Sequence, residues 1–101
     1  MILNPNESGK FWNFLCFVHK NVKSEYKLKL SEEKTFQCRY FTSFESDNEL
    51  ELDDSNYEEY WIICFKNMHS DYIHEINYHN ISLEVWCDGK KADLNKLESI
   101  I

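Results

Sequence analysis

The stretch YKLKLSEEKTFQCRYF, residues 26–41, decides the fold class because apolar and polar side chains alternate on both sides of a short polar segment. Its first half places Tyr or Leu at every second position between lysines, and its second half does the same with Phe36, Cys38 and Tyr40. Alternation with a period of two is typical of strands that bury one face. The polar segment at 31–34 is expected to form a turn, so the stretch predicts two antiparallel strands.

Further strands are expected along the rest of the chain. In NELEL, residues 48–52, the pattern predicts a strand that buries Leu50 and Leu52 and exposes Glu49 and Glu51. The continuous apolar run YWIICF predicts a central strand that is buried on both faces. Asp88-Gly89 is a strong hairpin turn signal. Strands are therefore predicted at residues 60–65, which is the run YWIICF, and also at 72–78 and 82–87.

A helix is expected at each end of the chain. Apolar side chains recur at three- and four-residue spacing from Phe11 to Val22, and Asn4 or Ser8 could cap this N-terminal helix. A short C-terminal helix is expected after Asp93. Together these elements predict an α+β fold in which the N-terminal helix packs on a mainly antiparallel sheet of about five to six strands. Residues 1–101 are expected to form a single globular domain.

The cysteines and the apolar runs indicate a reducing compartment. The four cysteines are widely spaced among apolar neighbours and include no C-x-x-C pair, so we interpret them as reduced core residues. No run is long enough to span a membrane. The N-terminal run FWNFLCFV lacks a basic region before it and a cleavage site after it, so a cytoplasmic protein is expected. Abundant Asn, Lys, Ile, Phe and Tyr with a single alanine favour a low-GC bacterial or phage genome.

Negative charge is concentrated in one segment of the chain. Residues 1–39 carry a balance of +3, residues 40–65 a balance of −8 with no basic side chain, and residues 66–101 a balance of −2, which together make up the net charge of −7. This distribution argues against nucleic acid and anionic membranes as direct partners. It favours a basic protein partner, whose association the field would accelerate. The other interpretation is a solvated connection that keeps the protein soluble and protects strand edges.

The candidate partner-binding residues combine these acids with nearby aromatic side chains, because interfaces are enriched in Tyr and Trp. If Glu49, Glu51 and Glu58 lie on strands, their charges would be held in rows. Trp86 shares a strand face with Ser82 and Glu84, so it either lies beneath the C-terminal segment or is an exposed anchor. The candidate set is Asp47, Glu49, Glu51, Asp53, Asp54, Tyr57, Glu58, Glu59, Trp61 and Trp86.

No motif in the sequence indicates catalysis, and no cofactor is expected. The histidines at 69, 74 and 79 are spaced by five, which places neighbours on different faces of a helix or strand and argues against a metal site. A Cys64–His74 pair would have to be assembled by folding, without a recognised flanking pattern. Two glycines are too few for a phosphate-binding loop. We therefore expect a protein that is not an enzyme.

In its size, its acidity and its lack of catalytic motifs, the chain resembles the small acidic immunity proteins of bacteria and the inhibitors that phages encode. The resemblance implies an inhibitor that covers the basic surface of one partner, such as a nuclease toxin or a defence enzyme. The alternative is a structural or homo-oligomeric subunit, for example a homodimer. Its apolar edge or Trp86 face would complete the sheet of a partner. This alternative has no inhibitory role.

Overall fold

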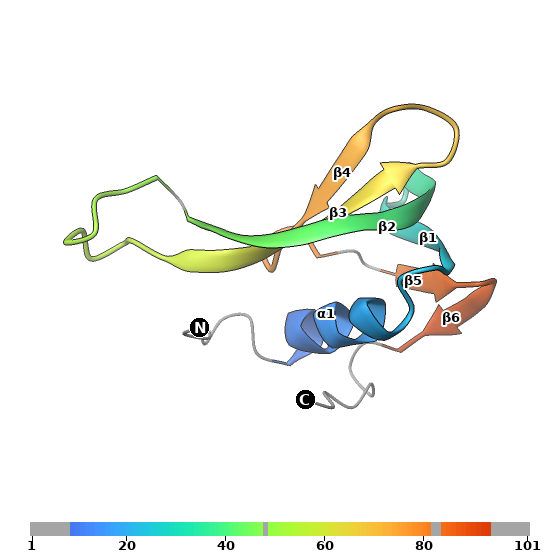
Figure 1. The fold of residues 1–101 in the computed structure, drawn as a ribbon, viewed down its shortest axis with the longest axis horizontal. Coiled ribbons are helices and arrows are strands. Elements are labelled where there is room, and N and C mark those ends of the chain that lie inside the picture. The colour runs from blue at the N-terminus through green and yellow to red at the C-terminus, as the bar shows by residue number, and fades with distance from the viewer. Residues whose placement is uncertain (1–8, 48, 82–83, 94–101) are drawn as a thin grey trace.

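In the residues that the structure describes, the fold is one helix packed on a six-stranded antiparallel sheet (Figure 1). The computed structural model describes residues 9–47, 49–81 and 84–93. In chain order the elements are α1 (Lys10–Lys20), β1 (Glu25–Ser31), β2 (Lys34–Asp47), β3 (Glu59–Asn67), β4 (Ile73–Ile76), β5 (Glu84–Cys87) and β6 (Lys90–Ala92). The strand order is β4-β3-β2-β1-β5-β6. The predicted α+β class and strand number are confirmed, whereas the C-terminal helix and the N-terminal caps Asn4 and Ser8 lie outside the described residues.

The β1–β2 hairpin forms as its alternating pattern predicts. Tyr26 pairs with Cys38 and Leu28 with Phe36, and the strands join through a tight turn at 32–33. The apolar run in β3 is also confirmed as an internal strand, since β3 lies between β2 and β4 and its residues 62–65 are all buried.

The strand expected at 48–52 is wrong. β2 instead continues to Asp47, and residues 49–58 form a loop in which Leu50 and Leu52 are 40% and 79% exposed. The Asp47 side chain accepts a hydrogen bond from the backbone N–H of Glu49 at 2.9 Å, and Glu49 has a φ of 64°. An Asx turn followed by a left-handed residue ends a strand, so local hydrogen bonding overrides the alternating pattern.

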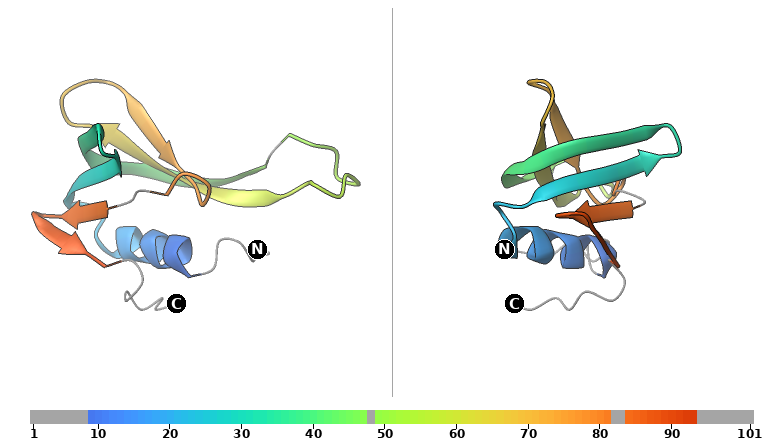
Figure 2. Two further views of the ribbon diagram at one scale, coloured as in Figure 1. Left: turned by 180° about the vertical axis from the view of Figure 1, so that it is seen from behind. Right: turned by 90° about the vertical axis from the view of Figure 1, so that its right-hand side faces the viewer.

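The core lies between α1 and the face of the sheet that β1, β2 and β3 present to it (Figure 2). The helix buries Phe11, Phe14, Leu15 and Val18, as its apolar spacing predicts. Phe14 stacks on Phe65 of β3 with ring centroids 5.8 Å apart. Such aromatic pairs add to the free energy gained by burying their surface, so they fix the helix on the sheet.

A β-bulge at Phe41 divides β2 into a core half and a projecting half. Tyr40 pairs with Phe65 and Thr42 with Cys64, which leaves Phe41 without an opposite residue on β3. The pairing of β1 with β2 ends at Arg39, and the pairing of β4 with β3 covers only 63–66. Beyond these points β2 and β3 continue together as a long two-stranded projection (Figure 1). We call residues 42–47, 49–58 and 59–62 the arm.

Candidate protein-binding site

Three carboxylates share one face of the arm. In the antiparallel register Asp47 lies directly opposite Glu59, and Glu45 lies directly opposite Trp61. Because side chains two residues apart on a strand point the same way, all four lie on the same face. Trp61 is half-buried against the core, so it forms the inner end of this face. We call Glu45, Asp47 and Glu59 the acidic face.

Tyr57 lies in the negative field of these carboxylates. Its hydroxyl donates a hydrogen bond to Glu59 Oε1 at 2.9 Å. This bond, together with the negative charges of Glu59, Asp47 and Glu45, raises the pKa of Tyr57 to about 12. Three carboxylates therefore act on one phenol, which stays neutral and keeps its hydroxyl hydrogen bond to Glu59 at physiological pH.

The acidic face is unfavourable for the folding of the free protein. Like charges directly opposite each other destabilise an antiparallel pair. In the described residues no ion pair within 4 Å offsets the charge of Asp47. Local features that oppose stability are typical of functional sites, so this geometry favours a binding surface over a solvated connection.

The tip of the arm carries the remaining acids in a series of turns. The backbone N–H of Asp54 donates to Glu51 O at 2.9 Å, and the backbone N–H of Tyr57 donates to Asp54 O at 3.0 Å. The Asp54 side chain accepts a hydrogen bond from the backbone N–H of Asn56 at 2.8 Å. Glu49, Glu51 and Asp53 are exposed in this loop, and Glu58 precedes the first residue of β3. The prediction that Glu49, Glu51 and Glu58 lie in rows on strands is therefore wrong.

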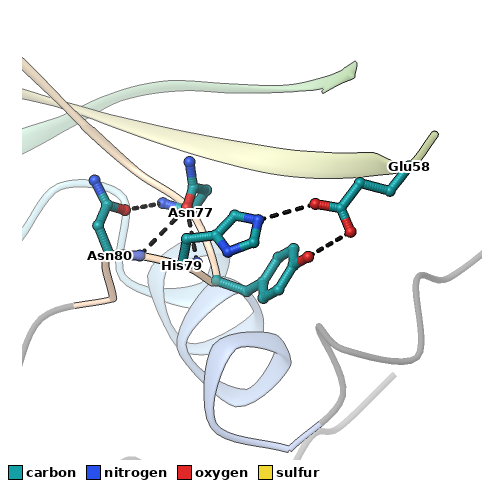
Figure 3. A network of polar contacts seen from close by, with 5 residues as sticks. Glu58, Asn77, His79 and Asn80 are labelled. Carbon is teal, nitrogen blue, oxygen red and sulfur yellow. Dashed lines mark hydrogen bonds and ion pairs between the residues drawn. The ribbon is translucent and has the colours of Figure 1, made fainter. Parts of the chain in front are cut away.

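Glu58 has a different environment from the other acids. Its two carboxylate oxygens accept hydrogen bonds from the hydroxyl of Tyr78 at 2.5 Å and from Nε2 of His79 at 2.9 Å (Figure 3). Asn77 and Asn80 fix the same loop, since the Asn80 side chain accepts a hydrogen bond from the backbone N–H of Asn77 at 2.7 Å. Glu58 lies next to the outermost strand pair, Asp47 with Glu59, so it ties the outer end of the paired strands to residues 77–80.

Trp86 lies in basic surroundings on the outer face of the sheet. The register aligns Gln37, Lys27, Trp86 and Lys91 in one row across four strands. The ammonium groups of Lys27 and Lys91 lie 4.3 and 5.9 Å from the centroid of the Trp86 ring. An open pocket of about 370 Å³ adjoins this row. β5 lies at the opposite end of the molecule from the tip of the arm, so Trp86 is not brought together with the acids (Figure 1).

The histidines and cysteines have separate structural environments. His74 is only 6% exposed, lies 3.1 Å from the Asn67 side-chain amide, and has its pKa lowered by burial. His74 lies opposite Phe65, whereas Cys64 lies opposite Glu75, so Cys64 and His74 point to opposite faces of the sheet. Desolvation raises the pKa of the buried Cys38 thiol to about 12. Within the described residues, no group of three His, Cys, Asp or Glu side chains could hold a metal ion.

Sequence reasoning missed two features of the arm. Glu45 was part of the acidic segment but not of the candidate set, and its place on the acidic face depends on the register that follows the bulge. Phe41 and Phe44 are 59% and 41% exposed, although an aromatic residue in a strand pattern is usually interpreted as core. Neither the bulge nor the length of the hairpin has a local sequence signal.

Comparison with known proteins adds the family. Neither curated proteins nor solved structures give a significant match. The helix that the structure describes is too short and too polar to cross a membrane. The family model described as "Cognate immunity protein YxxD" matches residues 12–99, which is most of the chain and includes the whole sheet. The chain belongs to the family of cognate immunity proteins YxxD.

Proposed function

We propose that this protein inhibits a toxin by covering a basic surface of it with the acidic face of the arm. The observation that carries the proposal is that Glu45, Asp47 and Glu59 share one strand face, where the Tyr57 hydroxyl donates a hydrogen bond to Glu59. Membership of a cognate immunity family implies a protein partner. The basic character of that partner, its identity as a nuclease and the cytoplasm as the site of action belong to the proposal.

The mechanism is steric and electrostatic blockade without catalysis. The carboxylates would occupy the positions that the phosphates of a nucleic acid substrate take on the toxin, and the exposed acids of the tip, Glu49, Glu51, Asp53 and Asp54, would extend the negative field. Tyr57 and Trp61 would supply the contact area that charge alone lacks. The hydrogen bonds of Glu58 with Tyr78 and His79 would hold the arm in one orientation, which reduces the conformational entropy lost on binding.

The test compares two charge-matched triple variants. In the first, E45Q, D47N and E59Q neutralise the acidic face. In the second, E32Q, E33Q and D71N neutralise three exposed acids elsewhere, so each variant has three negative charges fewer than the wild type. The basic protein that the wild type captures from a bacterial lysate is identified, purified and used to measure association rates.

We expect the first variant to associate at least about tenfold more slowly at low salt, and the second to remain close to the wild type. Equal rates for both variants would show that net charge, and not this face, attracts the partner. Equal rates for all three proteins would contradict the proposal.

The alternative function is a homo-oligomeric or structural subunit that associates through the Trp86 face. The open pocket beside Trp86 favours association through that face. The exposed Phe41 and Phe44 favour the other form of this alternative, association through an apolar strand edge, because exposed apolar groups often mark interfaces. Size-exclusion mass at low and high salt separates the two functions. A dimer that persists at both salt concentrations and is lost in Trp86→Ala supports the alternative, whereas a monomer supports the inhibitor.

A further inference from the structure

The arm has one strand edge that no other strand covers in the described part of the chain. On one side, β2 pairs with β3 as far as Asp47. On its other side, β2 pairs with β1 only as far as Arg39. The segment 42–47 therefore presents a row of backbone N–H and C=O groups away from β3, and such a row is a template for another strand.

The opposite edge of the arm is different because a loop lies against it. Residues 77–80 approach the start of β3, where Tyr78 and His79 donate hydrogen bonds to Glu58 (Figure 3). The ring of His79 also meets the ring of Tyr60 edge-on, with centroids 6.0 Å apart. A strand that approached β3 from this side would have to displace the loop. The edge of β2 is the accessible one.

The accessible edge has a distinct chemical pattern on each face. Glu45 and Asp47 lie on the acidic face, while Thr42 and Phe44 lie on the other face, where Phe44 is 41% exposed. A strand added to this edge would place its own side chains beside these rows, acid-facing and Phe44-facing in alternation. Carboxylates on an edge commonly prevent pairing with unsuitable strands. They would not repel a strand that places Lys or Arg beside them.

We propose that the partner toxin adds an extended segment to the edge of β2, with Lys or Arg beside Glu45 and Asp47 and apolar side chains beside Phe44. This inference rests on the proposed function and specifies how the partner binds. Main-chain hydrogen bonds would supply affinity, and the alternating rows would supply specificity. Strands without basic residues would be rejected because they leave the carboxylates unpaired.

The probe is a short synthetic peptide of alternating Lys and Val, added at up to millimolar concentration to the full chain. Its control is a block peptide with all the Lys residues first and all the Val residues after them, which has the same charge and composition but no strand amphipathicity. Hydrogen exchange and amide NMR shifts report where each peptide binds. We expect the alternating peptide to slow exchange of those amides in 42–47 that point away from β3, and to bind about tenfold more tightly than the block peptide, since several cross-strand pairs contribute together.

Three outcomes overturn the inference. They are equal binding of both peptides, protection confined to the loop 49–58, and no protection of 42–47 at millimolar peptide. If any of these occurs while toxin capture still depends on the acidic face, strand addition is wrong and the proposed function stands. If the alternating peptide pairs with the edge but the acidic-face variant captures the toxin as well as the wild type does, the proposed function is wrong and strand addition stands.

Discussion

Neutralising Glu59 should stabilise the free protein while it weakens partner binding. Glu59 lies directly opposite Asp47, and such pairs have Cβ atoms about 5 Å apart. Two negative charges about 6 Å apart in water repel each other by about 0.7 kcal/mol, and physiological salt reduces this to about half. Glu59→Gln retains an oxygen that can accept the Tyr57 hydroxyl hydrogen bond, so it removes mainly the charge. We expect the free energy of unfolding to rise by about 0.5 kcal/mol at low salt.

The assay is urea unfolding at pH 7, at low and high salt, with Glu33→Gln as the matched control. Glu33 lies in the exposed β1–β2 turn, and its neutralisation changes the net charge by the same amount. The gain for Glu59→Gln should exceed that of the control at low salt and shrink as salt is added. A loss of stability in Glu59→Gln, or a gain equal to that of Glu33→Gln, would refute the argument that cross-strand repulsion opposes folding.

The same variant connects stability with function. If the acidic face binds a basic partner, Glu59→Gln should associate more slowly with that partner even though the variant is more stable. A stabilised variant that binds normally would mean that the repulsion serves no binding role. Opposite signs for folding and association are difficult to explain if these acids only solvate a connection.

Four further predictions concern individual side chains. Phe65→Ala should lower the free energy of unfolding by about 3–5 kcal/mol, measured by urea unfolding, because a fully buried ring at the centre of the core leaves a cavity. Burial lowers the pKa of His74 in the folded state below its ordinary value of 6.5, so the unfolded chain takes up the proton first as the pH falls. The free energy of unfolding, measured by urea unfolding, should therefore fall as the pH drops below about 6.5. His74→Leu should lack this part of the pH dependence. In an NMR titration the pKa of Tyr57, about 12 in the wild type, should move towards its ordinary value in Glu59→Gln, and no movement would mean that the two side chains do not meet in solution. Trp86→Leu should leave the association rate with the toxin unchanged. A decrease in that rate as large as the decrease in the acidic-face variant would place the interface on the outer face of the sheet.

The fold could be predicted from the sequence wherever burial has a clear period. The β1–β2 hairpin follows from alternation, the internal position of β3 from a continuous apolar run, and the buried stripe of α1 from helical spacing. Residues 48–52 show the same alternation, but the described residues 49–52 form no strand. Leu50 and Leu52 lie near the tip of the arm, away from the core, and both are exposed. The Asx turn at Asp47 also gives the backbone hydrogen bonds that replace those of a strand.

The candidate site could be predicted only in part, because its geometry depends on contacts between distant segments. The acidic segment is evident from its composition, but the meeting of Asp47 with Glu59 depends on the register that follows the bulge at Phe41. The hydrogen bonds of Glu58 with Tyr78 and His79 join segments about twenty residues apart. Trp86 belongs to a row of four strands whose lysines come from both sides of the acidic segment. A linear charge map contains none of these contacts.

The two interpretations of the acidic segment 40–65, a binding surface and a solvated connection, require different structures. A connection requires only that its acids reach water, and the loop 49–58 satisfies that requirement. It does not require two strands to extend beyond the core with Asp47 facing Glu59, Glu45 on the same face, and a tyrosine hydroxyl held by one of the carboxylates. Ordered like charges cost stability in the free protein, and a basic partner would offset that cost. The hydrogen bonds of Glu58 at the outer end of the paired strands also keep the acidic face and the strand edge in a fixed relation, so a toxin segment could meet both at once.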